Sequence, residues 1–293
     1  MTSEGACQVH VERRNGGKPL VTGWSCVKHA AGEPQEADRK SMRQQRAVAL
    51  LERNEYQMFQ VEALTVPREE WRQAVRWSIK DMLDYPVANA TVDVLEIPAD
   101  GSNPTRPRFM LAVAARHEAV RHRIERYIEQ TPMGLEAIDI PEIAQRNLAA
   151  LLEQEGRGLA MLTFCAEGGL LTLTGGGELY HARQIDVSVD QLQKPDVERR
   201  HHVYERVALD LQRSLDNFER QFPYLAVGRL VVAPFPARDE FLAYLRSYLY
   251  LQVESFELAD LFDLTEVPEL LDISQQPSAL HLLGVALRED VAR

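Results

Sequence analysis

Three groups of residues in this sequence have types and spacings that could support chemistry, and each also has a simpler structural explanation. The glycine run at 175–177 could let backbone N–H groups surround a phosphate. We favour a hairpin turn, because neither a helix start nor a lysine follows the run, as a phosphate-binding loop requires. His201 and His202 could bind a metal ion, but adjacent helical residues point about 100° apart and share an ion poorly.

Cys165 could act as a nucleophile, although a cysteine in a buried strand is more often a packing residue. No Ser–His–Asp or Cys–His arrangement accompanies it. The sequence therefore predicts no catalytic residue and no metal site. Together with Cys7 and Cys26, the cysteines are few, odd in number and widely spaced, which predicts no disulfide framework and favours a reducing compartment.

Composition narrows the class of protein. The chain has 293 residues, of which 45% are hydrophobic, so it can bury a sizeable core and more than one domain is expected. Its net charge of -11 argues against a nucleic-acid partner, because such proteins need a basic face to displace counterions from phosphates. No apolar run reaches the roughly 18 residues of a membrane helix, and the N-terminus has no apolar signal core. We therefore expect a soluble cytoplasmic chain.

The elements that position these residues follow the hydrophobic pattern of an α/β protein. The first half opens with a hairpin around Asn15-Gly16-Gly17, since Asn-Gly suits a tight turn, and a helix is predicted over 37–54. A strand–helix–strand–strand–helix–strand block then occupies roughly 55–140, which suits a small α+β insert. The first helix of this block has Pro67 in its first turn, and its apolar stripe consists of Trp71, Val75, Ser78 and Met82, widened by Ala74 and Ile79.

The second half repeats this outline after a linker at 155–158. Three strands with glycine-rich turns precede a long helix from about 198 to 222. A buried strand, a proline-broken turn, a helix and another strand follow from Gly228, and a last helix begins at Pro277. We therefore predict two lobes, 1–155 and 156–293, with the insert in the first.

The stretch "VPREEWRQAVRWSIKDMLDYPVANATVDVLEIP" resembles the actin-like cytoplasmic component of type IV pilus assembly, the PilM type. The stretches "MGLEAIDIPEIAQRNLAALL", "ERVALDLQRSLDNFERQF" and "ALHLLGVALR" are similar to the same family, in the same order. Within it, "EIAQRNLAALLEQEGRGLAMLTF" and "GELYHARQIDV" are most similar to the MshI type, from biogenesis of the mannose-sensitive haemagglutinin (MSHA) pilus. The resemblance covers about residues 50 to 288.

The resemblance implies the fold of actin and of the division protein FtsA, with two ribonuclease-H-like lobes and an insert in the first. The cytoplasmic domain of the type II secretion component GspL shares this fold. GspL continues into a membrane helix, whereas this chain ends "LREDVAR" without one, which counts against that assignment. The first strand of the fold is also missing, so Met1 marks either a truncated chain or a misplaced start.

An actin-type nucleotide site needs two Asp-x-Gly hairpins for the phosphates and a Gly-Gly turn for the adenosine. No aspartate in this sequence has a glycine two residues later. We therefore expect no ATP hydrolysis and weak nucleotide binding or none, with ATP and Mg²⁺ as the alternative cofactors. The degenerate positions are Gly5 for the first hairpin, Cys165, Glu167 and Gly168 for the second, and Ala233 and Pro234 for the adenosine turn.

Trp77 lies off the centre of its helix's apolar stripe, so it is either core at the stripe's edge or a surface aromatic that grips a partner. In the PilM-type family, a groove between the first lobe and its insert captures the cytoplasmic tail of an inner-membrane partner of the PilN type. The resemblance places that groove in this chain at Arg76, Trp77, Lys80, Tyr85 and Pro86.

Two functions follow from the sequence. The first is a non-catalytic cytoplasmic scaffold for MSHA-type pilus biogenesis, held at the inner membrane through a PilN-like partner and other assembly components. The alternative is an ATP-binding regulator of pilus assembly or of type II secretion, which needs nucleotide affinity without the Asp-x-Gly motifs.

Overall fold

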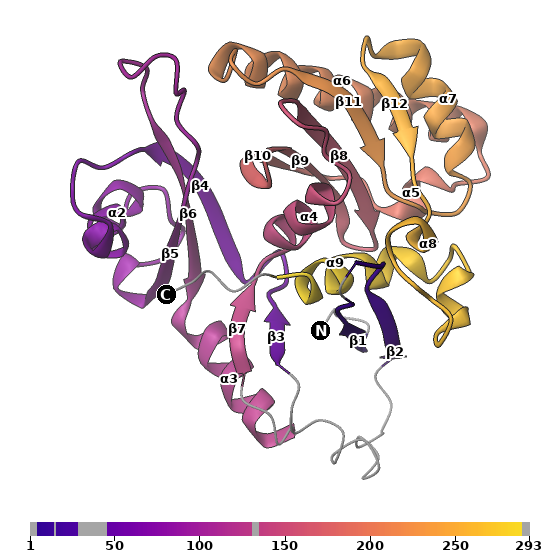
Figure 1. Cartoon of the computed structure of the whole chain (residues 1–293), viewed down its shortest axis with the longest axis horizontal. Helices are drawn as coiled ribbons and strands as arrows, with labels where there is room; N and C mark the ends of the chain where they lie inside the picture. The colour runs from indigo at the N-terminus through magenta and orange to yellow at the C-terminus, as the bar shows by residue number, and fades with distance from the viewer. Residues whose placement is uncertain (1–4, 15, 29–45, 131–134, 289–293) are drawn as a thin grey trace. The chain divides into compact units, whose positions relative to one another are not determined.

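The computed structural model describes residues 5–14, 16–28, 46–130 and 135–288. The described residues form two compact units (Figure 1): the first contains 46–130 and 135–141, and the second contains 5–14, 16–28 and 142–288. This division falls at Pro141/Glu142, and the helix that begins at Pro141 bonds to the sheet of the second unit through Gln145. The division does not test the predicted lobe boundary at 155/156. The assignment of two actin-like lobes stays a prediction.

The first unit contains a three-stranded antiparallel sheet. Along the sheet the strands are β4 (Tyr56–Glu62), β6 (Phe109–Arg116) and β5 (Ala90–Glu96). Helix α2 (Trp71–Ile79) packs on this sheet and closes a small core. That core consists of Val75, Ile79, Tyr85, Ala90, Val92, Met110, Ala112 and Ala114. The predicted strands and helix of the insert are therefore present.

The apolar stripe of α2 differs from the prediction. Val75 and Ile79 are fully buried, whereas Ser78 is exposed and Met82 is 49% exposed. The physical reason is that the helix ends at Ile79, so Met82 lies beyond the last turn and cannot continue the buried face.

A second correction concerns the helix predicted over 37–54. Ala47–Leu50 forms strand β3, which pairs in parallel with β7 (Leu135–Asp139). The short apolar run of this segment fits a buried strand as well as a helix, and pairing with β7 decides for the strand. The part of the predicted helix before residue 46 lies outside the described residues.

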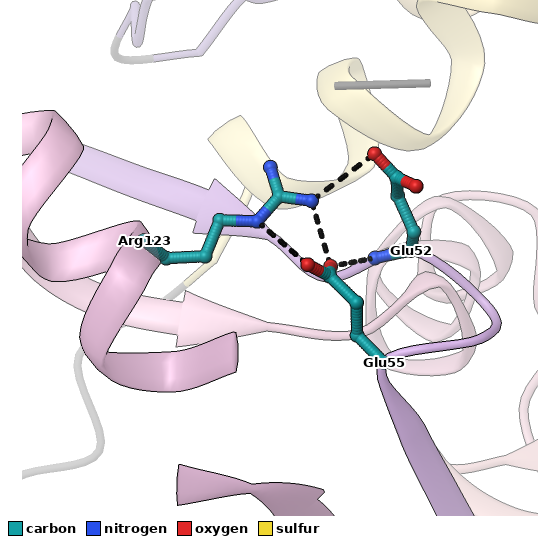
Figure 2. Close-up of polar contacts among 3 residues, drawn as sticks. All are labelled: Glu52, Glu55 and Arg123. Carbon is teal, nitrogen blue, oxygen red and sulfur yellow. Dashed lines mark hydrogen bonds and ion pairs between the residues drawn. The ribbon is translucent and has the colours of Figure 1, made fainter. Parts of the chain in front are cut away.

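Helix α3 (His117–Gln130) is tied to the turn between β3 and β4 by one arginine (Figure 2). The guanidinium of Arg123 lies 2.6 Å from Glu55 Oε2 and 3.2 Å from Glu52 Oε1. The backbone N–H of Glu52 also donates to Glu55 Oε2 at 2.7 Å. These side chains are only 12–29% exposed, so the ion pairs are partly shielded from water.

The second unit is built on a five-stranded mixed sheet, and the sequence pattern predicts each of its strands. β8 (Gly158–Cys165), β9 (Gly168–Gly175) and β10 (Glu178–Ile185) form an antiparallel meander. β11 (Val227–Val232) and β12 (Gln252–Ser255) then run parallel to β8, which gives the order β10-β9-β8-β11-β12. Every residue of β9 is buried, so elements cover both faces of the sheet at this strand.

Helices α4 (Pro141–Ala150) and α9 (Gln276–Ala286) cross closely in this unit. A Cβ atom on Gly284 would lie 2.2 Å from the carbonyl oxygen of Ala144, so only glycine allows the approach. The other helices are α5 (Val189–Leu192), α6 (Val197–Gln221), α7 (Arg238–Tyr248) and α8 (Leu258–Leu261).

The predicted N-terminal hairpin is present as β1 (Gly5–Glu12) and β2 (Leu20–Lys28). It is anchored to the second unit because Val21 N donates to Asp263 O and Asp263 N donates to Pro19 O, both at 2.9 Å. The expectation of no disulfide is wrong: Cys7 and Cys26 face each other across this hairpin and are joined as a disulfide. Antiparallel pairing brings together two cysteines that lie 19 residues apart in sequence.

No helix in the described part of the chain combines the length and the hydrophobicity needed to cross a bilayer.

Candidate functional site

The second degenerate phosphate hairpin is the turn between β8 and β9. Cys165 pairs directly with Gly168, and Ala166 and Glu167 form the exposed turn between them. Gly168 has a φ of 139°, a backbone conformation that a side chain disfavours. The Cys165 thiol lies 3.2 Å from both Glu167 Oε2 and the Gly168 carbonyl oxygen, so it donates into its own turn.

Burial, together with the neighbouring Glu167 carboxylate, raises the pKa of the Cys165 thiol to about 11. The thiol is therefore protonated near neutral pH, whereas a nucleophilic cysteine needs a lowered pKa. This environment favours the packing role of Cys165 over the nucleophilic one.

The degenerate adenosine turn follows β11. Ala233 N donates to Leu162 O at 2.8 Å, and both Ala233 and Pro234 are buried. Because β8 and β11 are parallel neighbours, the turn after β11 and the Cys165 turn lie at the carboxyl ends of adjacent strands. Gly5, which stands at the position of the first phosphate hairpin, begins β1 in the separate two-stranded sheet.

Aromatic rings fill the space beside these two turns. Phe164 packs edge-to-face against Phe235 and against Phe241, with ring centroids 5.7 Å apart in both pairs. A Cβ atom at Gly169 would lie 2.7 Å from the Phe164 ring, so this glycine makes room for packing. The surroundings of the two turns are thus apolar and closely packed.

A buried polar network, which the sequence analysis missed, lies on the same sheet. Gln145 Nε2 on α4 donates to Met161 O at 2.8 Å and to Thr172 Oγ1 at 3.0 Å. Thr163 Oγ1 donates to Gln145 Oε1 at 2.7 Å, and His281 Nε2 on α9 lies 3.2 Å from the same oxygen. The network holds both helices on β8 and β9. No sequence motif indicates it, because its members come from four separate elements.

The glycine run and the histidine pair have structural explanations. Gly176 and Gly177 have φ values of 61° and 77° and connect β9 to β10, so the hairpin prediction is confirmed. The N–H of Gly177 donates to Glu153 Oε2 at 2.7 Å, which places a carboxylate where a phosphate would bind. His202 faces Glu205 at 3.6 Å.

The predicted partner-binding residues lie on α2 or in the loop that follows it in the first unit. Trp77 is 73% exposed, so it is a surface residue and not a core residue, and its role in gripping a partner stays a prediction. The ammonium of Lys80 lies 5.7 Å from the centroid of the Trp77 ring. The guanidinium of Arg76 instead donates to the backbone, with Nη2 2.9 Å from Ala90 O.

Tyr85 is the buried member of this group. Its side chain is 9% exposed, and its Oη has no hydrogen-bond partner among the described residues. Burial raises the pKa of Tyr85, and the Arg116 guanidinium, 4.1 Å above the ring, opposes that shift. A buried hydroxyl without a hydrogen-bond partner is energetically costly. Pro86 follows it and is exposed.

The comparisons with known proteins identify the fold. No protein-family model matches the sequence. No curated protein matches it either. Among solved structures, a chain of the "PilM-PilN type IV pilus biogenesis complex" superposes with a TM-score of 0.68 at 18% identity, over 96% of this chain and 94% of that one.

Two other structures overlap less. The cytoplasmic domain of EpsL, an inner membrane component of the type II secretion system of Vibrio cholerae, has a TM-score of 0.48 at 10% identity, over 79% of this chain and 78% of that one. A Bacteroides thetaiotaomicron protein with an actin-like ATPase fold has a TM-score of 0.46 at 10% identity, over 92% and 97%. The predicted mixed α/β class is confirmed, and this chain shares its fold with a chain of the PilM–PilN complex.

Proposed function

We propose that this protein is a non-catalytic cytoplasmic docking protein for type IV pilus biogenesis, of the MSHA type. In this role it binds the cytoplasmic tail of a PilN-like inner-membrane protein and so works at the membrane surface through its partners. The observation that carries the proposal is the exposed Trp77 on α2, in a chain that shares its fold with a chain of the PilM–PilN complex.

The chemistry of this surface supports a peptide as the ligand. Trp77 and Met82 offer exposed apolar area, and the Lys80 ammonium over the indole adds a positive charge. β5 is an end strand of its sheet, so its free edge can take up an extended segment through backbone hydrogen bonds.

Replacing Trp77 with alanine tests the docking surface. We expect Trp77→Ala to weaken the affinity for the partner at least about tenfold. Truncating an anchoring tryptophan typically costs about 2 kcal/mol or more of binding free energy. The measurement is co-purification from a pilus-bearing cell, followed by affinity for the captured protein's cytoplasmic tail. Tyr250→Ala is the matched control, because Tyr250 is a fully exposed aromatic residue in the second unit. If Trp77→Ala and Tyr250→Ala bound that tail with equal affinity, the proposal that Trp77 belongs to the docking surface would be contradicted.

The absence of Asp-x-Gly and the aromatic packing beside Pro234 support the non-catalytic role. We expect isothermal calorimetry with Mg-ATP to give no binding stronger than about millimolar. The sequence has no Asp-x-Gly motif to bring backbone N–H groups and a carboxylate to a magnesium triphosphate. Micromolar affinity would refute this expectation and favour the ATP-binding regulator.

A further inference from the structure

Helix α6 carries a line of arginines on its outer side. Arg199, Arg206, Arg213 and Arg220 follow one another at intervals of seven residues. Seven residues of an α-helix make almost two turns, with a drift of only about 20°, so these side chains form a nearly straight stripe. At about 1.5 Å per residue the stripe is about 32 Å long. We call these four residues the arginine stripe.

Among the described residues, carboxylates pair with this stripe only at its start. Arg199 lies 3.3 Å from Asp196, the residue that caps the helix. Further along, Arg206 donates to the backbone oxygen of Asp186, and Arg220 donates to the backbone oxygen of Asp216, so neither pairs with a carboxylate.

Arg213 is exposed and makes no ion pair among the described residues. The distal half of the stripe therefore keeps its positive charge, on a chain whose net charge is -11.

A groove runs between this half of the stripe and strand β10. Its cavity volume is about 370 Å³, and it is lined by His181, Ala182, Arg183, Arg213, Ser214, Asn217 and Arg220. Arg183 pairs with Asp210 at 2.7 Å, which leaves Arg213 and Arg220 as the unneutralised cations of the lining. Burial, together with the Arg183 charge, lowers the pKa of His181, so its ring is neutral at pH 7 and adds no charge.

β10 forms one end of the five-stranded sheet, so one side of its backbone has no neighbouring strand. Edge strands of this kind accept an extended peptide through backbone hydrogen bonds. The groove therefore combines a free strand edge with two arginines, which bind carboxylates through paired N–H groups.

We infer that the groove between β10 and α6 binds an extended, acidic segment of a partner protein. A continuous polyanion suits the surface less well, because Glu205, Asp216 and Glu219 flank the stripe on the same helix and the chain is acidic overall. A flat anionic bilayer suits it less well too, because the site is a groove bordered by a strand edge. This surface is separate from the Trp77 surface, and its test does not depend on pilus assembly.

The experiment uses the full chain and a labelled twelve-residue peptide in which glutamate alternates with threonine. In a strand this alternation places all the glutamates on one face. The matched peptide has glutamine at every glutamate position. We expect fluorescence polarisation at low salt to show binding of the glutamate peptide at least tenfold tighter than of the glutamine peptide. We expect the double variant Arg213→Gln, Arg220→Gln to lose that difference.

Arg121→Gln is the control variant, because Arg121 is an exposed helical arginine of the first unit, with 69% of its side chain exposed. It should bind both peptides as the parent chain does. Equal binding of the two peptides by the parent chain would overturn the inference. So would tighter binding of a twelve-nucleotide RNA or of phosphatidylglycerol vesicles that the double variant abolishes, since the stripe would then serve a polyanion.

Discussion

At the residue scale, the positions where an actin-type site would hold phosphates carry packing groups. Cys165 stands where the second hairpin would have an aspartate, and its thiol is buried beside Glu167. Its pKa of about 11, against an ordinary 9.0, lowers the thiolate fraction at pH 8 by about 100-fold. We expect iodoacetamide to alkylate Cys165 slower by about that factor in the native chain than in urea, as followed by peptide mass spectrometry.

Glu167→Gln provides the control for this prediction. Removing the carboxylate takes away one cause of the raised pKa, so alkylation should speed up, while desolvation keeps it slower than in the unfolded chain. If the native chain were alkylated as fast as the chain in urea, neither burial nor the Glu167 carboxylate would disfavour the Cys165 thiolate.

At the element scale, one side chain joins α3 to the turn between β3 and β4. Arg123→Gln leaves Glu52 and Glu55 side by side without their cation, in a site that is only partly open to water (Figure 2). Surface pairs contribute up to about 1 kcal/mol and buried ones about 3–5 when broken, so a loss of about 1–2 kcal/mol is expected. Urea unfolding, read as a shift of the midpoint, measures it.

Arg121→Gln on the same helix is the comparison, because its pair with Glu125 is exposed on both sides. It should cost less than about 0.5 kcal/mol. If the two variants lost equal stability, the ion pairs of Arg123 would have no special role in holding this turn.

The elements also show which features a sequence can predict. The strands of the insert and the meander at β8–β10 follow from alternation and turn residues, and the long helix α6 follows from its periodic apolar face. Ala47–Leu50 was predicted as helix because a short apolar run fits either state, and only pairing with β7 decides.

The residues of the candidate sites also differ in whether the sequence indicates their place. The position of Trp77 off its stripe left core and surface equally open, and the structure places it on the surface. The network of Gln145, Thr163 and His281 and the Cys7–Cys26 disulfide depend on contacts between distant segments, which spacing does not encode.

At the scale of the whole molecule, aspartates in both units bind protons less readily in the folded state. The pKa of Asp100 is lowered, first by the Ser102 hydroxyl, and that of Asp272 by the Ser274 N–H. The pKa of Asp263 is lowered by the Thr265 hydroxyl and N–H and by Arg14, which also ties the N-terminal hairpin to this segment. A lowered folded pKa means that the unfolded chain takes up protons first as the pH falls. The stability that these three carboxylates contribute is therefore fully present above about pH 4 and is lost as the pH falls further.

Asp263→Asn tests this argument at the point where the hairpin is anchored. The variant should melt at a lower temperature than the parent near neutral pH, because the ionised carboxylate no longer accepts hydrogen bonds from Thr265 and Arg14. The difference should shrink as the pH falls towards 3, where the parent's carboxylate becomes protonated too. Circular dichroism melts between pH 3 and 7 measure both, with Asp239→Asn as control, since that side chain is 99% exposed. A gap in melting temperature that stays constant across this range would show that Asp263 acts through packing, with its charge irrelevant to how the hairpin is held.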